Sequence, residues 1–327
     1  MHRVAIAVVI LVAGCSSVTD DIVFRYGHSQ PPESPRSQSM LFFEQQLESR
    51  SNGRIRVENY FSGTLGSERE MMDMVATGVL HGTRGGLFAD ANPKYVIFML
   101  PFLVENWDQA IRLVNSDFAA EINRGARKHG FHVPATGISQ GFRAHTNSIR
   151  SIESPEDLQD LKMRVPPQEI YVLTARAFGA SPQELPASDI YSALKTGVLD
   201  GQDNPPSNIW DYKIYEVQDF MTITYYSTGP DPFIVSLDWY DNLDGDLQEL
   251  FDAVASEAIS YSDTLNRNSE ETYVEQLRGE LTVNVLSPEQ QGAFRALAAP
   301  VYEHFVNSGV LSDADISRAR EIAQGAE

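Results

Sequence analysis

Apolar and polar residues follow two different spacings in the first part of the chain. Ile22–Gly27 and Arg54–Phe61 alternate with a period of two, which is typical of half-buried strands. Pro35–Arg50 instead has its apolar residues at helical spacing. Ser67, followed three residues later by Glu70, begins a second helix as a capping box. This alternation of strand and helix predicts an α/β sheet with parallel pairing.

The same patterns predict the elements of the remaining chain. Strands are expected at Tyr95–Leu103, which Pro101 interrupts, and at Phe131–Ile138, Gly141–Thr146, Lys162–Val165, Phe220–Tyr225, Pro232–Ser236 and Leu281–Leu286. Helices are expected from about Trp107 to His129, after Ser154-Pro155, through Trp210 and Tyr215, over Leu247–Arg278, after Ser287-Pro288 with an interruption at Pro300, and over Ser312–Gln324.

Leu247–Arg278 contains neither Pro nor Gly, so it predicts one continuous helix. At a rise of 1.5 Å per residue it would be roughly 48 Å long. A chain of 327 residues is long enough for two domains, each with its own core. Since the helix is longer than either domain is wide, we expect it to run across both.

Composition narrows the classes of partner. Hydrophobic residues make up 42% of the chain and aromatic residues 10%, which is typical of a folded globular protein. The net charge of -20 makes nucleic acid and an anionic membrane surface unfavourable partners. A small anion is still compatible with this charge, because two local arginines can outweigh a distant, screened negative field.

The N-terminus is typical of an exported protein. Met1–Gly14 has a basic end followed by a short apolar run, so we expect a signal peptide over residues 1–14. Small residues precede Cys15, the only cysteine, as in a bacterial lipobox. We therefore expect a lipid anchor at Cys15 and a polar tether over 15–21, with an ordinary signal peptide and an incidental cysteine as the alternative.

Three strong polar groups follow or end predicted strands in the middle of the chain. Arg143 and Arg164 lie in short strand-like segments, and Asn204 follows a third. Ligands of open α/β sheets gather at strand ends. A guanidinium can bind a carboxylate through two parallel hydrogen bonds. The three residues together therefore predict a carboxylate receptor.

The words around these residues resemble a known family. Gly141-Phe142-Arg143, Ser154–Leu158, Lys162–Pro166 and Gly197–Pro205 are similar to words in the solute-binding proteins of tripartite ATP-independent periplasmic (TRAP) transporters, the DctP family. The resemblance covers nearly the whole chain after the tether. Two positions depart from the family pattern: Asp203, where Glu is usual, and Ser151, where Pro is common.

The resemblance implies roles for several residues. Arg164 is expected to form the main salt bridge to a ligand carboxylate, with Arg143 assisting and Asn204 hydrogen-bonding beside it. Further ligand contacts are expected from Tyr226 and Phe233, near the hinge, and from Arg84, where the first lobe faces the cleft. No cofactor is implied. The ligand is expected to be a small organic acid, with C4-dicarboxylates, sugar acids, keto acids, aromatic acids and ectoine-like compounds all left open.

The resemblance also implies the fold and the location. We expect a two-lobed periplasmic binding protein with a hinge and a long helix spanning both lobes. Lobe I would comprise 22–145 plus about 230–260, and lobe II 146–229 plus about 261–327. The protein would be periplasmic and would deliver its ligand to a TRAP membrane permease, or would serve a sensory system instead.

An enzyme is the remaining alternative. Gly137–Gly141 matches the G-x-S-x-G word of serine hydrolases, with Ser139 as the nucleophile. In a hydrolase a helix would follow, whereas Phe142–Thr146 is predicted to be extended, and His304 is the only distant later histidine. No H-E-x-x-H metal motif is present. The sequence therefore favours a binding protein without a metal site.

Overall fold

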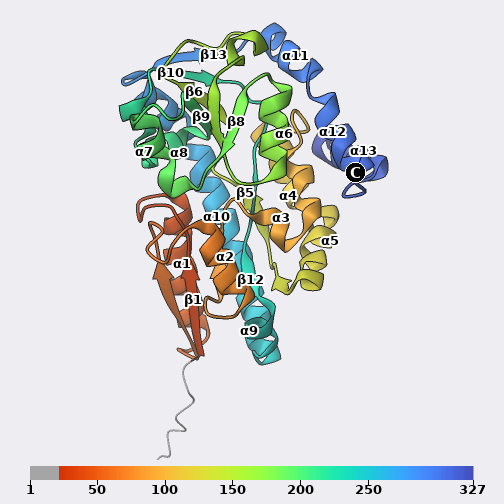
Figure 1. Ribbon diagram of the computed structural model, residues 1–327. Coiled ribbons are helices and arrows are strands. Elements are labelled where there is room, and N and C mark those ends of the chain that lie inside the picture. The colour runs from red at the N-terminus through yellow and green to blue at the C-terminus, as the bar shows by residue number, and fades with distance from the viewer. Residues whose placement is uncertain (1–21, 327) are drawn as a thin grey trace, which may run out of the picture.

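The computed structural model describes residues 22–326 and has two principal β-sheets, one in each half of the molecule (Figure 1). The predicted signal peptide over 1–14, the lipidation site at Cys15 and the tether over 15–21 lie outside the described residues. In the described part of the chain, no helix is both long and apolar enough to cross a membrane.

The first sheet has five strands in the order β2-β1-β3-β12-β4. Their bounds are Ile55–Tyr60 for β2, Ile22–Gly27 for β1, Gly82–Thr83 for β3, Ile234–Ser236 for β12 and Phe131–His132 for β4. β1 pairs in parallel with β2 and β3, which confirms the predicted parallel pairing. β12 is antiparallel to both of its neighbours.

Side-chain caps begin the first two helices, and the one at Ser67 is predicted from the sequence. In α1 (Pro35–Arg50), the Ser34 side chain accepts a hydrogen bond from the backbone N–H of Ser37. In α2 (Glu68–Ala76), Ser67 and Glu70 form the reciprocal bonds of a capping box. Such caps satisfy backbone N–H groups that have no partner within the helix. They fix the first turns of α1 and α2, which follow strands β1 and β2.

The second sheet has six strands in the order β13-β10-β6-β9-β7-β8. Their bounds are Thr282–Val285 for β13, Phe220–Ile223 for β10, Ala144–Asn147 for β6, Gly201–Asn204 for β9, Lys162–Val165 for β7 and Ser181–Glu184 for β8. β7 runs parallel to β9, whereas β6 is antiparallel to β9. The start of β6 therefore lies at the same edge of the sheet as the ends of β7 and β9.

Three segments connect the two halves. Residues 139–143 lead from β5 (Thr136–Ile138) to β6, and residues 224–229 lead from β10 to β11 (Pro230–Pro232), which pairs with β5. The third is α10 (Gly245–Arg278), a single helix of 34 residues, as predicted. It contributes Phe251 to the core of the first sheet and Leu277 to the core of the second. Figure 1 shows α10 passing between the two halves.

Shorter helices complete the fold. They are α3 (Phe88–Ala91), η3 (Pro155–Leu158), α6 (Glu169–Ala177), η4 (Ala187–Asp189), α7 (Ile190–Lys195), α8 (Pro206–Asp211), η5 (Ile214–Val217), α9 (Leu237–Asp241), α11 (Pro288–Ala296), α12 (Ala299–Asn307) and α13 (Asp313–Gln324). α13 packs on α4, so the C-terminal helix contacts a helix from the first half of the chain. The division into lobes at the boundaries given above remains a proposal.

Several predicted elements are wrong in type or extent. Tyr95–Leu103 is not a strand: Asn92 caps the 3₁₀ helix η1 (Pro93–Met99), and Pro93 suits its first turn. The predicted helix from Trp107 to His129 is divided into α4 (Trp107–Val114), α5 (Asp117–Gly125) and η2 (Ala126–His129), because Ser116 caps a new helix. In both regions a side-chain cap, Asn92 or Ser116, sets where a helix begins, and the apolar pattern alone does not show this position.

Candidate functional site

A cavity of about 40 Å³ lies between the two halves and brings together three of the predicted site residues. Its lining comes from both halves of the molecule and from the connecting residues 139–143. The lining residues are Gln30, Arg36, Glu68, Gly86, Ser139, Gln140, Arg143, Arg164, Pro166, Tyr171, Ala187, Asn204, Asn208 and Tyr212. Most of them carry hydrogen-bonding side chains, so the cavity is suited to a polar molecule.

Strand pairing explains how Arg143, Arg164 and Asn204 meet. Arg164 is in β7, Asn204 is the last residue of β9, and Arg143 immediately precedes β6. Ala144 lies opposite Asn204, and Arg164 lies opposite Gln202. All three side chains are therefore placed at one edge of the second sheet, as the sequence predicts for strand ends.

Arg164 is buried without a carboxylate partner among the described residues. Its side chain is 2% exposed, and its Nε donates a hydrogen bond of 2.8 Å to the carbonyl oxygen of Leu185. Burial lowers the pKa of Arg164 to about 10, although the negative charge of Glu68 partly offsets this effect. A buried guanidinium in such surroundings favours binding of an anion.

Arg143 has the opposite surroundings. Its Nε donates to the Asp203 carboxylate at 2.5 Å, a terminal nitrogen donates to the Asp203 carbonyl oxygen at 2.6 Å, and its carbon Cζ lies 4.7 Å from the Tyr171 ring centroid. Burial alone would lower the pKa of Arg143, but the negative charge of Asp203 outweighs it and raises the pKa above its ordinary value. The charge of Arg143 is thus already compensated within the protein.

Asn204 is held by amide side chains. Its Nδ2 donates to Gln202 Oε1 at 2.5 Å, and its Oδ1 accepts from Asn208 Nδ2 at 3.2 Å. Asn208 Oδ1 in turn accepts from Gln30 Nε2 at 2.8 Å. This last bond joins the two halves of the molecule across the cavity, because Gln30 follows β1 and Asn208 belongs to α8.

The other three predicted ligand contacts do not line the cavity. Arg84 is 1% exposed and donates to Ser39, Ser262 and Asp231 inside the first half. Phe233 is fully buried in the aromatic core of the first sheet. Tyr226 lies behind the cavity, where its hydroxyl donates to the Asp203 carboxylate. Tyr226 therefore supports Arg143 through Asp203.

Several cavity residues from the first half and from α8 were not predicted from the sequence. These are Gln30, Arg36, Glu68, Asn208 and Tyr212. Arg36 and Glu68 lie in the first turns of helices that follow strand ends, and ligands of α/β sheets gather at such positions. Asn208 is four residues after Asn204 and directly follows the Pro205-Pro206 helix start. These positional signals could have indicated them.

Ser139 lines the cavity but has no histidine partner among the described residues. Its hydroxyl bonds to Gln140 at 3.0 Å and accepts from Arg36 at 3.5 Å. His304 instead pairs with Glu169 at 3.0 Å. A serine nucleophile requires an adjacent base. The surroundings of Ser139 therefore provide no support for the hydrolase alternative.

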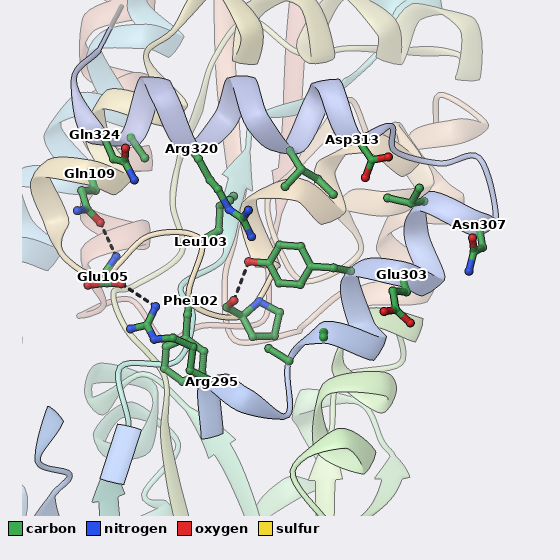
Figure 2. Close-up of a pocket in the computed structure, with 17 residues that line it drawn as sticks. Phe102, Leu103, Glu105, Gln109, Arg295, Glu303, Asn307, Asp313, Arg320 and Gln324 are labelled. Atoms are coloured by element: carbon green, nitrogen blue, oxygen red, sulfur yellow. Dashed lines mark hydrogen bonds and ion pairs between the residues drawn. The ribbon is translucent and has the colours of Figure 1, made fainter. Parts of the chain in front are cut away.

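A larger groove of about 680 Å³ lies elsewhere, between the segment after η1 and helices α11, α12 and α13 (Figure 2). Two of its charged residues pair with each other: Arg295 forms an ion pair of 2.7 Å with Glu105. The Tyr302 hydroxyl donates to the Pro101 carbonyl oxygen at 2.8 Å. None of the predicted ligand-binding residues lines this groove, so the smaller cavity is the candidate site.

Comparisons with known proteins point in the same direction. The family model DctP, described as bacterial extracellular solute-binding protein, family 7, matches residues 26–308. A "C4-dicarboxylate-binding periplasmic protein DctP" of Vibrio cholerae is 27% identical over 300 residues, which cover 87% of this chain and 86% of that protein. An uncharacterized protein, y4mM, of Sinorhizobium fredii is 29% identical over 288 residues, covering 88% of this chain and only 53% of that protein.

The fold is also found in a solved structure. The "sugar acid binding protein DctPAm" from Advenella mimigardefordensis, solved in complex with galactonate, has a TM-score of 0.88 to this chain at 24% sequence identity. The match covers 94% of this chain and 99% of that one. Such a match shows a common two-lobed α/β fold with a long helix.

Proposed function

The chain belongs to the DctP family of bacterial extracellular solute-binding proteins, the solute-binding proteins of TRAP transporters, and on this premise we propose that it captures a small carboxylate at Arg164 and delivers it to a membrane permease. The protein binds its ligand and releases it unchanged. Members of the family are extracytoplasmic periplasmic proteins, and we propose the same location for this chain.

The observation that carries the proposal is the isolation of Arg164. Its guanidinium is buried at the edge of the second sheet and has no carboxylate partner in residues 22–326. A buried charge without a partner is unfavourable, and an incoming carboxylate removes that penalty through charge-assisted hydrogen bonds. Arg143 and Asn204 line the same cavity, and we propose that they orient the carboxylate beside Arg164.

Ligand entry requires the two halves to separate. The cavity holds only about 40 Å³, and the Gln30–Asn208 hydrogen bond joins its two sides. We propose that lobe I, 22–145 with about 230–260, and lobe II, 146–229 with about 261–327, move about the connecting residues 139–143 and 224–229. Hinge closure around a ligand is a common transition in two-lobed binding proteins.

Delivery and anchoring follow from the family and the N-terminal sequence. We propose that the loaded, closed form docks on TRAP permease subunits, and that Cys15 carries a lipid which holds the protein at the membrane. A sensory system is the second candidate partner. Co-purification with the permease subunits from detergent-solubilised membranes would support the transport role.

A thermal-shift screen tests the proposed function. The protein without its first 15 residues is heated with small carboxylates, each matched with its amide or alcohol. A ligand that binds only the native state stabilises it by about 4 kcal/mol at a thousandfold excess over Kd. A shift for an acid but not for its neutral analogue is expected. Equal shifts for both, or shifts for none of the acids, would contradict carboxylate capture.

A further inference from the structure

We propose that the cavity selects a hydroxylated monocarboxylate over the dicarboxylate of the same carbon skeleton. This inference rests on the proposed function and narrows its ligand class. Relatives of this chain include a protein named for C4-dicarboxylates and one solved with galactonate, a monocarboxylate. Membership of the family therefore does not decide how many carboxylates the ligand carries, whereas the buried charges of this cavity do.

Arg36 is the first cavity arginine that is already compensated. Its Nε and a terminal nitrogen donate to the two oxygens of Asp231 at 3.3 and 3.0 Å, and Arg36 and Asp231 are 3% and 0% exposed. Asp231 also accepts from Arg84, which does not line the cavity and has further bonds to Ser39 and Ser262. The donors of Arg36 are thus directed largely into the protein.

Arg143 is compensated in the same way by Asp203. The carboxylate of Asp203 is 4% exposed and accepts from both Arg143 and Tyr226. The Asp203 carbonyl oxygen takes a further guanidinium donor of Arg143. Arg143 can still contribute a hydrogen bond to a ligand, but its positive charge has a partner. Of the three arginines that line the cavity, only Arg164 lacks a buried carboxylate partner among the described residues.

Glu68 adds a negative charge to the same cavity. It is the first residue of α2, and its Oε1 accepts a hydrogen bond of 3.2 Å from the hydroxyl of Ser29. Its carboxylate is close enough to Arg164 to influence the guanidinium electrostatically. A second ligand carboxylate would therefore approach the like charge of the half-buried Glu68, which repels it. A ligand hydroxyl could instead donate to Glu68.

The sum of the charges in and around the cavity agrees with one ligand carboxylate. The arginines that line the cavity or share their partners are Arg36, Arg84, Arg143 and Arg164, and the corresponding carboxylates are Glu68, Asp203 and Asp231. The positive excess is one charge. Asp263 lies near Arg84 and Asp231, and since burial raises its pKa to about 7, its partial ionisation can only reduce that excess. A monoanion balances the cavity, and a dianion overfills it.

The remaining lining favours hydroxyl groups on the ligand. Side-chain amides and hydroxyls make up much of the cavity lining beside the arginines, and the apolar contribution is small. The polar groups are Gln30, Ser139, Gln140, Asn204, Asn208 and Tyr212. Buried polar groups left unpaired are unfavourable, so an acid with an alkyl chain would lose hydrogen bonds that water otherwise provides.

Isothermal titration with three matched triads tests the inference. Each triad has one skeleton with zero, one or two carboxylates: D-glucitol, D-gluconate and D-glucarate; galactitol, D-galactonate and galactarate; erythritol, D-erythronate and meso-tartrate. In any triad that binds, we expect the monoacid to bind at least about tenfold more tightly than the diacid, because of like-charge repulsion at the second end. Hexanoate is expected to bind more weakly than D-gluconate.

The possible outcomes distinguish a failure of the monocarboxylate preference from a failure of carboxylate capture. A diacid that binds as tightly as its monoacid, or hexanoate that binds as tightly as D-gluconate, would overturn the inference and leave carboxylate capture intact. Equal binding of polyol and acid, or no binding in any triad, would contradict the proposed function and the inference with it.

Glu68→Gln tests the origin of the preference. Removing the charge should narrow the monoacid preference by about tenfold, while the amide can still accept from a ligand hydroxyl. Asp73→Asn is the matched control, because Asp73 lies on the exposed face of the same helix and does not line the cavity. If Glu68→Gln leaves the monoacid preference unchanged, Glu68 does not contribute to it. If Asp73→Asn changes the preference by the same amount, the effect comes from the net charge of the protein and not from the position of Glu68.

Discussion

Arg164 and Arg143 lie at the same edge of one sheet but have different surroundings. Arg164 donates to a backbone carbonyl and has no acidic partner in the described chain, whereas Arg143 is bonded to Asp203. At the scale of single residues, function follows from which charge has been left without compensation. Asp203 is the residue that compensates Arg143.

Arg164→Ala should weaken carboxylate binding at least ~100-fold. The guanidinium's hydrogen bonds to a charged group contribute ~1.5–3 kcal/mol, and the ligand carboxylate would be left buried without its partner. Isothermal titration with the best acid from the thermal-shift screen measures the loss. Arg278→Ala is the control, since Arg278 is exposed at the end of α10. An affinity within about threefold of wild type would contradict the role given to Arg164.

Asp211→Asn should stabilise the protein at pH 8 and not at pH 4. Burial raises the pKa of Asp211 to about 7, and its Oδ2 has no hydrogen-bond partner. The cost of ionising it is absent below the unfolded-state pKa and fully present above about pH 7. Urea unfolding should show a gain on the order of 2 kcal/mol at pH 8 after allowance for partial exposure. A gain of equal size at pH 4 would exclude ionisation as the cause.

At the scale of elements, the close contact between β6 and β9 explains a glycine in the Asp200–Asn204 word. A Cβ on Gly201 would lie 2.2 Å from the carbonyl oxygen of Thr146 and 2.8 Å from Asn147 Cβ. No flexible side chain can yield there, because the nearest atom is backbone. The glycine allows β9 to approach β6, and this approach places Asn204 beside Ala144 at the cavity.

Gly201→Ala should therefore destabilise the protein by ~2–3 kcal/mol or prevent folding, since overpacking against a backbone atom forces the strands apart. Gly292→Ala is the matched control. Gly292 lies inside α11, a Cβ there meets nothing within 4 Å, and alanine is the better helix former. Thermal or urea unfolding of both variants measures the difference, and equal stabilities would contradict the close packing of β9 on β6.

At the scale of the whole molecule, one helix and two connecting segments hold two sheets around a shared cavity. α10 packs in both cores, so it can act as a rigid support while the halves move. α13 adds a second restraint, because it packs on α4 and Arg112 donates to the carbonyl oxygen of Ala323 at 2.6 Å. Any opening of the cavity must then occur by rotation about the connecting segments.

Small-angle scattering should show a smaller radius of gyration when the bound acid is present, because the ligand favours the closed arrangement. Arg164→Ala at the same acid concentration should keep the radius of the unliganded protein. Wild-type protein with a neutral analogue of the acid serves as the second reference. An identical radius with and without the acid would contradict hinge closure and leave the binding residues untouched.

The sequence alone determined the local features of this protein. Strands β1 and β7, helices α1 and α10, and the cap at Ser67 were predicted correctly because their signals lie within a few neighbouring residues. The placement of Arg143, Arg164 and Asn204 at strand ends was also predictable, because the position of a residue along a strand depends on its neighbours in sequence.

Only the tertiary structure decided which charges are compensated. Arg84 meets Asp231 across 147 residues of chain, and Glu68 reaches the cavity of Arg164 from the other sheet. Phe233 lies in the aromatic core because it directly precedes β12, and β12 pairs with β3 and β4, which are distant in sequence. Periodicity indicates which residues are buried but not which residue each one meets, so partners and net charge of the cavity depended on the folded arrangement.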